Sequence, residues 1–245
     1  MKTTLKPLFI MLFLLFNSEG NGQSLNLTVG YTSSTARIEG LTLGESTINH
    51  SDGSTEYASI KINRLNGFNF GAGYEFRLGN HLSLETGLRF QTRGYSLDLT
   101  EEARIDTLNI YAADVVFDMS MNYLDVPLVL NTSFTAGDFR FYARTGMYLG
   151  VLGWVNLNTQ VNMTSIFGND AFSEQETYGG RELENKLTAG IILGAGVEYK
   201  GFFLEANYNR DLRAYGRFED DLFYDNKTYT RDLSLNVGYR IKFGK

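Results

Sequence analysis

The feature that most constrains this chain is an alternation of side chains with a period of two, which returns in segment after segment. In residues 68–76 every second side chain is apolar or aromatic, and the residues between them are Asn69, Gly71, Gly73 and Glu75. Successive side chains of a β-strand point to opposite faces of the sheet. The pattern therefore predicts a strand with one apolar face and one face of small and polar residues, which is typical of a membrane-spanning barrel.

The same alternation marks seven further segments. They are residues 24–34, 82–91, 121–134, 139–151, 186–200, 202–210 and 233–243. Each is long enough for a tilted membrane strand of about 10 residues. An even number of strands closes a ring with both ends of the chain on one side. We therefore predict an all-β fold, an eight-stranded antiparallel up-and-down transmembrane β-barrel, preceded by a cleaved signal peptide.

The connections between these segments alternate in length. Short turns are predicted at Gly79-Asn80, 136–138 and Lys200-Gly201. Long polar connections are predicted as loops near 35–64, 97–120, 155–184 and 211–230. Periplasmic turns and extracellular loops of outer-membrane barrels sort in this way. A soluble β-sandwich or a lipocalin-like barrel would alternate too, but with apolar residues in an interior, and neither explains the sorting of loops.

The N-terminus has the features of a secretory leader. Lys2 and Lys6 precede an unbroken apolar run from Leu8 to Phe16, which is too short for a membrane-spanning helix of about 20 residues. Small and polar residues follow, and we place the cleavage site at Gly22-Gln23. The prediction is a signal peptide over 1–22 and an outer-membrane barrel domain over 23–245, with an uncleaved anchor as the alternative.

Charge and composition argue against a nucleic-acid-binding protein and exclude a fold stabilised by disulfides. Removing the leader takes away two lysines and one glutamate and leaves a formal net charge of −7, against −6 for the full chain. Phosphate binding needs clustered Lys and Arg, so no nucleic acid is expected as a partner. The chain has no Cys, so its stability does not come from disulfides. We expect no cofactor and no metal.

Two stretches carry a resemblance to a known family. YLDVPLVLNTSF, Tyr123 to Phe134, and FRFYARTGMYLGVL, Phe139 to Leu152, resemble a paired hairpin of the PorT-like outer-membrane barrels common in Bacteroidetes, which are small barrels of the OmpX and OmpA kind. The resemblance implies a place in the outer membrane and a link to gliding or protein secretion. Pro127 lies inside the first stretch, and because it has no N–H it predicts a bulge or a missing ladder bond.

The last segment is similar to the assembly signal that outer-membrane barrels present to the barrel-assembly machinery. The pattern is carried by Asn236, Gly238, Ile241 and Phe243. The usual pattern ends at the aromatic residue, whereas this chain continues for two more residues. Recognition by that machinery is the prediction.

Charged residues fall on the polar faces of the predicted strands. They are Glu75, Arg77, Glu85, Arg89, Arg140, Arg144, Glu198, Glu205 and Arg240. An eight-stranded barrel has an interior only wide enough for side chains. Unpaired buried charge is very costly. We therefore predict a salt-bridged, plugged lumen, with a selectivity lining as the alternative.

The long connections hold the remaining candidates. His50, Ser51 and Asp52 are contiguous, and three consecutive residues rarely converge as a catalytic triad must, so no catalytic residue is predicted. Aromatic residues in these connections either bind a partner or extend the barrel wall as ordered hairpins. Trp154 is predicted at the membrane interface, with Tyr31, Tyr95 and Tyr215 beside it.

Three functions are consistent with these patterns. The first is a non-enzymatic envelope protein, surrounded by outer-membrane lipid, that presents its extracellular loops to a protein partner or stabilises the membrane. The second is a small porin-like transport channel. The third is a membrane-embedded hydrolase.

Overall fold

The structure of the protein is a computed structural model. It describes residues 23–39, 41, 43–49, 54–105, 108–165, 168–179, 186–213 and 228–243. The predicted signal peptide lies outside the described residues. The elements of the described part are β1 (Gln23–Ile38), β2 (Gly44–Asn49), β3 (Ser54–Arg77), β4 (Leu82–Ile105), β5 (Leu108–Ala136), β6 (Phe139–Ser165), β7 (Gly168–Gly179), β8 (Leu187–Tyr199), β9 (Phe202–Asp211) and β10 (Thr228–Phe243). In this part of the chain no helix is long and apolar enough to span a membrane.

Eight of these strands close into a ring. Hydrogen-bonded neighbours follow the order β1-β10-β9-β8-β6-β5-β4-β3, and β3 pairs back onto β1 from Ser24–Glu75 to Ser34–Leu65. All of the pairings are antiparallel. Closure leaves the ring no unpaired edge. The predicted eight-stranded antiparallel barrel is confirmed, and β2 and β7 pair with β3 and β6 outside the ring.

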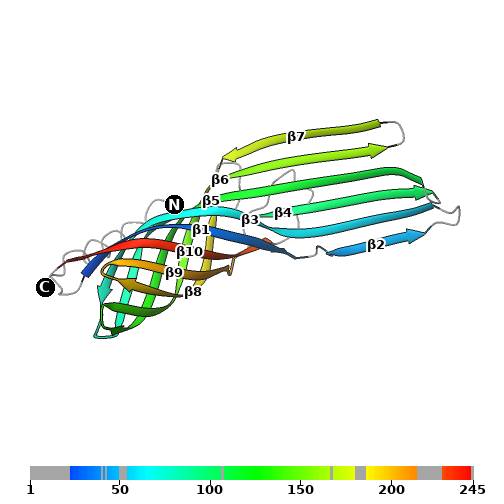
Figure 1. Cartoon of the computed structure of the whole chain (residues 1–245). Coiled ribbons are helices and arrows are strands. Elements are labelled where there is room, and N and C mark those ends of the chain that lie inside the picture. The colour runs from blue at the N-terminus through cyan, green and yellow to red at the C-terminus, as the bar shows by residue number, and fades with distance from the viewer. Residues whose placement is uncertain are drawn as a thin grey trace.

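The three short turns lie where they are predicted, at the end of the barrel that holds the end of β10 (Figure 1). Gly137, with φ 61°, and Lys200 and Gly201, with φ 50° and 91°, have left-handed backbone conformations. Glycine adopts that region without steric cost, which allows such tight reversals.

Most residues of 35–64, 97–120 and 155–184 are not irregular loops but strands, as in the alternative that these connections extend the barrel wall as ordered hairpins. The strands β3, β4, β5 and β6 run without a break out of the ring, and with β2 and β7 they form a sheet that projects beyond one end of the barrel (Figure 1). We call this sheet the extension. Of the fourth predicted loop, residues 214–227 lie outside the described part of the chain.

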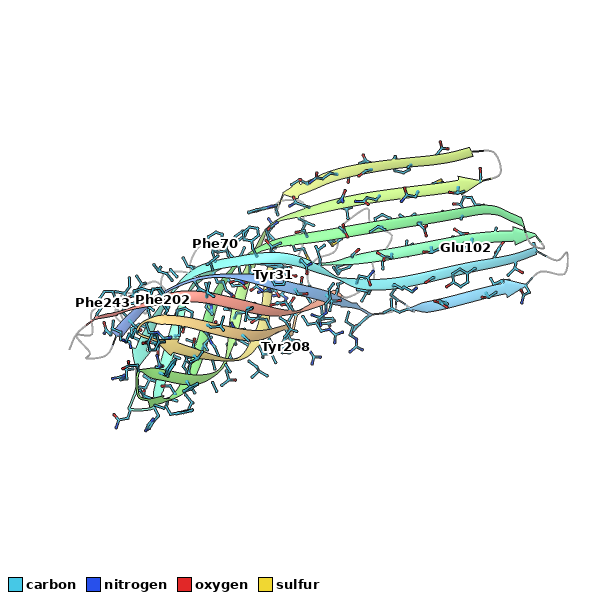
Figure 2. The ribbon with its side chains drawn as sticks, viewed as in Figure 1. Tyr31, Phe70, Glu102, Phe202, Tyr208 and Phe243 are labelled. Atoms are coloured by element: carbon cyan, nitrogen blue, oxygen red, sulfur yellow. The ribbon has the colours of Figure 1, made fainter. Side chains whose placement is uncertain are left out.

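The outer surface of the ring is apolar and exposed. Val29 and Met147 are 56% and 58% exposed, although both are large hydrophobic residues. Outward aromatic residues lie toward both ends, with Phe202 and Phe243 near the short turns and Tyr31 and Phe70 nearer the extension (Figure 2). An apolar band with aromatic residues at both margins is the surface that a bilayer requires.

Inside the ring, small residues face large ones. The rings of Tyr142 and Tyr148 on β6 fill the space that a Cβ would occupy at Gly196 and Gly190 on β8. Pro127 interrupts the ladder between β4 and β5, whose pairing stops at Thr86–Leu128 and resumes at Arg89–Asp125 without a change of register. The missing ladder bond that this proline predicts is therefore confirmed.

We predict that Gly190→Ala destabilises the barrel by about 1–3 kcal/mol, because the new methyl group collides with the Tyr148 ring and the Arg210 carbonyl. Urea unfolding of the refolded protein in detergent, followed by the gel mobility shift of the folded barrel, measures the loss. Gly79→Ala is the matched control, since nothing lies within 4 Å of the point that a Cβ would occupy there. Equal stability of the two variants would contradict the packing described above.

Candidate functional site

The lumen near the short turns holds a network that we call the Glu–Arg cluster, formed by Glu75, Glu85, Glu198, Glu205, Arg140, Arg144 and Arg240. Arg140 donates to Glu75 at 2.6 Å and lies 3.4 Å from Glu198. Arg240 lies 3.0 Å from Glu75 and also pairs with Glu198. Two guanidinium groups thus lie between two carboxylates, all four supplied by different strands.

The same network continues around Arg144. Its guanidinium donates to Glu85 at 3.0 Å and pairs with Glu205. Asn26 and Asn131 each donate to the second oxygen of Glu85 at 3.2 Å. Because Glu85 has both a cation and two amide donors, the desolvation cost of its burial is offset.

A second network, which we call the Arg93 cluster, closes the lumen toward the extension. Arg93 is fully buried, and its guanidinium pairs with Asp125 and lies 3.3 Å from Asp211 and 3.4 Å from Asp232. These carboxylates come from β5, β9 and β10, so one side chain on β4 joins four strands across the lumen. Arg89 adds a second cation at 3.4 Å from Asp125.

Aromatic rings and amides complete the Arg93 cluster. The guanidinium carbon lies 4.5 Å from the ring centroid of Tyr148 and 4.9 Å from that of Tyr123, and both tyrosines are buried. Gln91 and Asn209 donate to Asp232 at 2.8 and 2.6 Å. Cation–π contacts strengthen when they are desolvated, as they are here.

Most of the predicted lumen residues lie within these two networks. Arg77 does not, because β3 ends at this residue and its side chain is exposed at the rim. Arg93, Asp125, Asp211 and Asp232 are buried lumen residues that the sequence-based prediction does not include. The period-two alternation could have indicated Arg93 and Asp211. Each lies two residues after a polar inward residue, Gln91 on β4 and Asn209 on β9, and therefore on the same face of its strand.

The two faces of the wall exchange their polarity just above the Arg93 cluster. On β4 the inward residues are mostly polar up to Arg93 and are apolar from Tyr95 to Leu99, before Glu101. The outward residues change in the opposite sense, from Phe90 to Ser96 and Asp98 on the same strand. Beyond the membrane the outer face meets water, so a strand of unbroken register must exchange its polar and apolar sides.

An apolar cluster lies directly over the Arg93 cluster. Its buried members are Ala36, Ile38, Tyr95, Leu97, Met119, Met121, Tyr123, Leu152 and Val155. Met121 is paired with Arg93 across β4 and β5, so the cluster follows the ionic layer without a gap in the ladder. We call it the apolar cap. Tyr95, predicted at the membrane interface, faces inward as part of this cap.

The other predicted residues lie apart from these networks. Trp154 lies on the outer side where the polarity changes, is 42% exposed, and packs against Phe90 with ring centroids 5.6 Å apart. Asn236 is buried in the lumen, while Ile241 and Phe243 are exposed on the outer face of β10. His50, Ser51 and Asp52 lie outside the described residues, as does Tyr215. In the described part of the chain, no group of His, Cys, Asp and Glu could hold a metal ion.

A closed ring with an apolar outer band and a charged interior defines a transmembrane β-barrel. The chain belongs to the outer membrane protein beta-barrel domain family, whose model matches residues 18–214. The protein is therefore an outer-membrane barrel, and its outer band contacts lipid. No curated protein matches the chain.

Several solved structures are similar to the chain. Ail, the attachment invasion locus protein of Yersinia pestis, solved with the heparin analogue sucrose octasulfate, is 17% identical; 91% of this chain and 100% of that chain are covered, with a TM-score of 0.38. Neisserial surface protein A is 11% identical, with 89% and 97% covered and a TM-score of 0.40. OprG from Pseudomonas aeruginosa is 9% identical, with 92% and 97% covered and a TM-score of 0.39.

We predict that Arg93→Met lowers the free energy of unfolding by about 3–5 kcal/mol, because it leaves three buried carboxylates with Arg89 as the remaining guanidinium. Urea titration in detergent measures this loss. Arg77→Met, at the exposed rim, should change stability by less than about 0.5 kcal/mol. If the two variants unfold at the same urea concentration, the Arg93 cluster does not stabilise the barrel.

Proposed function

We propose that the protein is a non-enzymatic envelope protein, a sealed barrel that anchors the extension and presents it to a protein partner. The observation that carries this proposal is the continuity of β3, β4, β5 and β6 from the charged lumen into the projecting sheet. The proposal includes removal of residues 1–22 as a signal peptide and recognition of β10 by the barrel-assembly machinery. A place in a secretion or gliding complex, as the PorT-like resemblance implies, is the partner-binding role we favour.

The sealed lumen favours anchoring over transport. Three layers follow one another along the axis, the Glu–Arg cluster, the Arg93 cluster and the apolar cap. Arg93, Tyr123, Tyr148 and Met121 are all at most 1% exposed. A solute would have to break buried ion pairs to pass, and each such break costs several kcal/mol.

Conductance in planar lipid bilayers distinguishes the proposed sealed barrel from a transport channel. We expect the folded wild-type protein to show no unitary conductance steps above the leak of the bilayer, because the lumen is filled by paired side chains. The gel mobility shift of the folded barrel verifies insertion of native protein. Reproducible steps whose size changes in Arg144→Glu would establish a charge-lined pore instead.

The partner-binding role is tested by trimming the extension while leaving the ring intact. Residues 99–115 and 161–172 are each replaced by Asn-Gly, which joins the paired positions Asp98–Val116 and Gln160–Ser173 by tight turns. We expect the trimmed barrel to fold and to lose the protein that chemical cross-linking joins to the wild type in intact cells. Cross-linking that survives trimming would place the partner on another surface.

The hydrolase alternative is tested separately. The proposal assigns no catalytic residue, and His50 is the histidine that a rim hydrolase would need. Ester or lipid hydrolysis by the purified wild type that disappears in His50→Ala would overturn the non-enzymatic assignment.

A further inference from the structure

The face of the extension that continues the lumen side of the wall is largely apolar, with Glu56 and Glu101 as acidic residues toward its far end. One row of paired residues crosses all of its strands, joining Gly44, Ile60, Leu99, Val115, Val161 and Phe172. We call this side the inner face. Its barrel-side part packs against the apolar cap through the partly buried residues Leu41, Ile60, Leu99 and Phe117.

The outer face of the extension is polar, unlike the inner face. Most of its side chains are polar, and several bond to one another. Asn63 donates to Asp98 at 2.5 Å, Thr177 to Asn156 at 3.1 Å, and Lys61 lies 3.7 Å from Glu45. This face is therefore suited to water, and the inner face is the side that needs a cover.

The inner face is exposed at its two margins, on β2 and on the β6–β7 hairpin. Phe172 is 54% exposed and Met163 is 36% exposed, whereas Val161, paired with Phe172, is buried. A large aromatic side chain and a methionine thus meet solvent side by side at the margin of the sheet. Exposed aromatic and methionine side chains of this kind are enriched in protein interfaces.

The carboxylates of β7 all lie on this same face. Asp170 pairs with Met163, Glu174 with Thr159 and Glu176 with Leu157, each across the inner face, and all three are exposed. The outward residues of β7 include Ala171, Ser173, Gln175 and Thr177, none of which is charged. Phe172 therefore lies between Asp170 and Glu174, each about 7 Å away along the strand.

We infer that the inner face of the β6–β7 hairpin docks a cationic segment of a partner protein that also carries large apolar side chains. The inference deepens the proposed function and rests on it. Lys and Arg stems can lie along Phe172 and Met163 while their charged groups reach Asp170 and Glu174. Apolar burial would supply most of the affinity, and the carboxylates would select the sign of charge and speed association.

Charge argues against a lipid as the occupant. The phosphate groups of lipopolysaccharide and of anionic phospholipids would be repelled by the carboxylates of β7. A second copy of this chain would bring the same carboxylates against one another if β7 faced β7. A cationic protein segment is the occupant that satisfies both the apolar centre and the acidic margin.

The test uses the full mature chain in nanodiscs of zwitterionic lipid. The probe is a fluorescein-labelled peptide of alternating Lys and Leu, as long as β7, and its fluorescence anisotropy reports binding. We expect Phe172→Ala to weaken binding by about tenfold, which is about 1.4 kcal/mol. We expect Asp170→Asn with Glu174→Gln to weaken it about three- to tenfold and to reduce its dependence on salt.

Matched controls lie on the outer face of the neighbouring strand β5. Val116→Ala removes an apolar side chain, and Asp114→Asn with Asp118→Asn removes two carboxylates, all facing away from the proposed site. These variants should bind the peptide within about twofold of the wild type, a difference below about 0.5 kcal/mol. A peptide with Glu in place of Lys should not bind.

Four results would overturn the inference. They are no binding to the wild type, equal binding by the inner-face and outer-face variants, equal binding of the Glu peptide, and a dimer in sedimentation that Phe172→Ala dissociates. The first three leave the proposed function untouched if cross-linking to a partner still depends on the extension. Loss of that dependence would instead remove the proposed function itself.

Discussion

The antiparallel ladder between β1 and β3 is the contact on which the rest of the molecule depends. Without it the strands would form an open sheet with two unpaired edges, and hydrocarbon offers no water to satisfy those backbone groups. With it the ring has eight strands, and eight strands enclose only enough space for side chains. Every charge that points inward must then find a partner among its neighbours, because neither water nor ions can screen it. The Glu–Arg cluster and the Arg93 cluster follow from closure.

The same geometry explains the extension. The strands β4 and β5 leave the bilayer without a change in their mutual register, so each keeps its two faces, but the surroundings of each face change. Outside the membrane, the face that met lipid meets water, and close to the barrel the face that met the lumen packs into the apolar cap. Tyr95 therefore follows Arg93 on the inner side, while Ser96 and Asp98 succeed Phe90 on the outer side. The apolar cap forms where this exchange occurs, and it closes the lumen above the last buried ion pair.

The sequence correctly predicts the ring, because each strand of the ring has an apolar outer face and a polar inner face. The strands of the ring, the short turns and the inward position of residues such as Glu75 and Arg144 all follow from alternation with an oily outer face. For the extension the same rule predicts loops, because the polarity there is reversed and the outer face is rich in Asn, Thr and Asp. Register shifts between Arg64 and Asn69 and between Asn122 and Tyr123 also interrupt the pattern where the reversal begins. The partners of Arg93 could not be predicted, because Asp232 meets it only through the register of the closed ring.

Continuity with the wall gives the extension a mechanical property that a set of loops would not have. Four of its strands are prolongations of wall strands, so tilting it against the barrel would require ladder bonds and the apolar cap to break together. A surface ordered in advance loses less conformational entropy when a partner binds than loops that must be ordered on contact. The Arg93 cluster contributes to the same end, since it joins β4 to β5, β9 and β10 at the base of the extension. Stiffness at the base and an apolar, acidic margin at β7 are the two properties that the proposed display of the extension to a cationic partner would require.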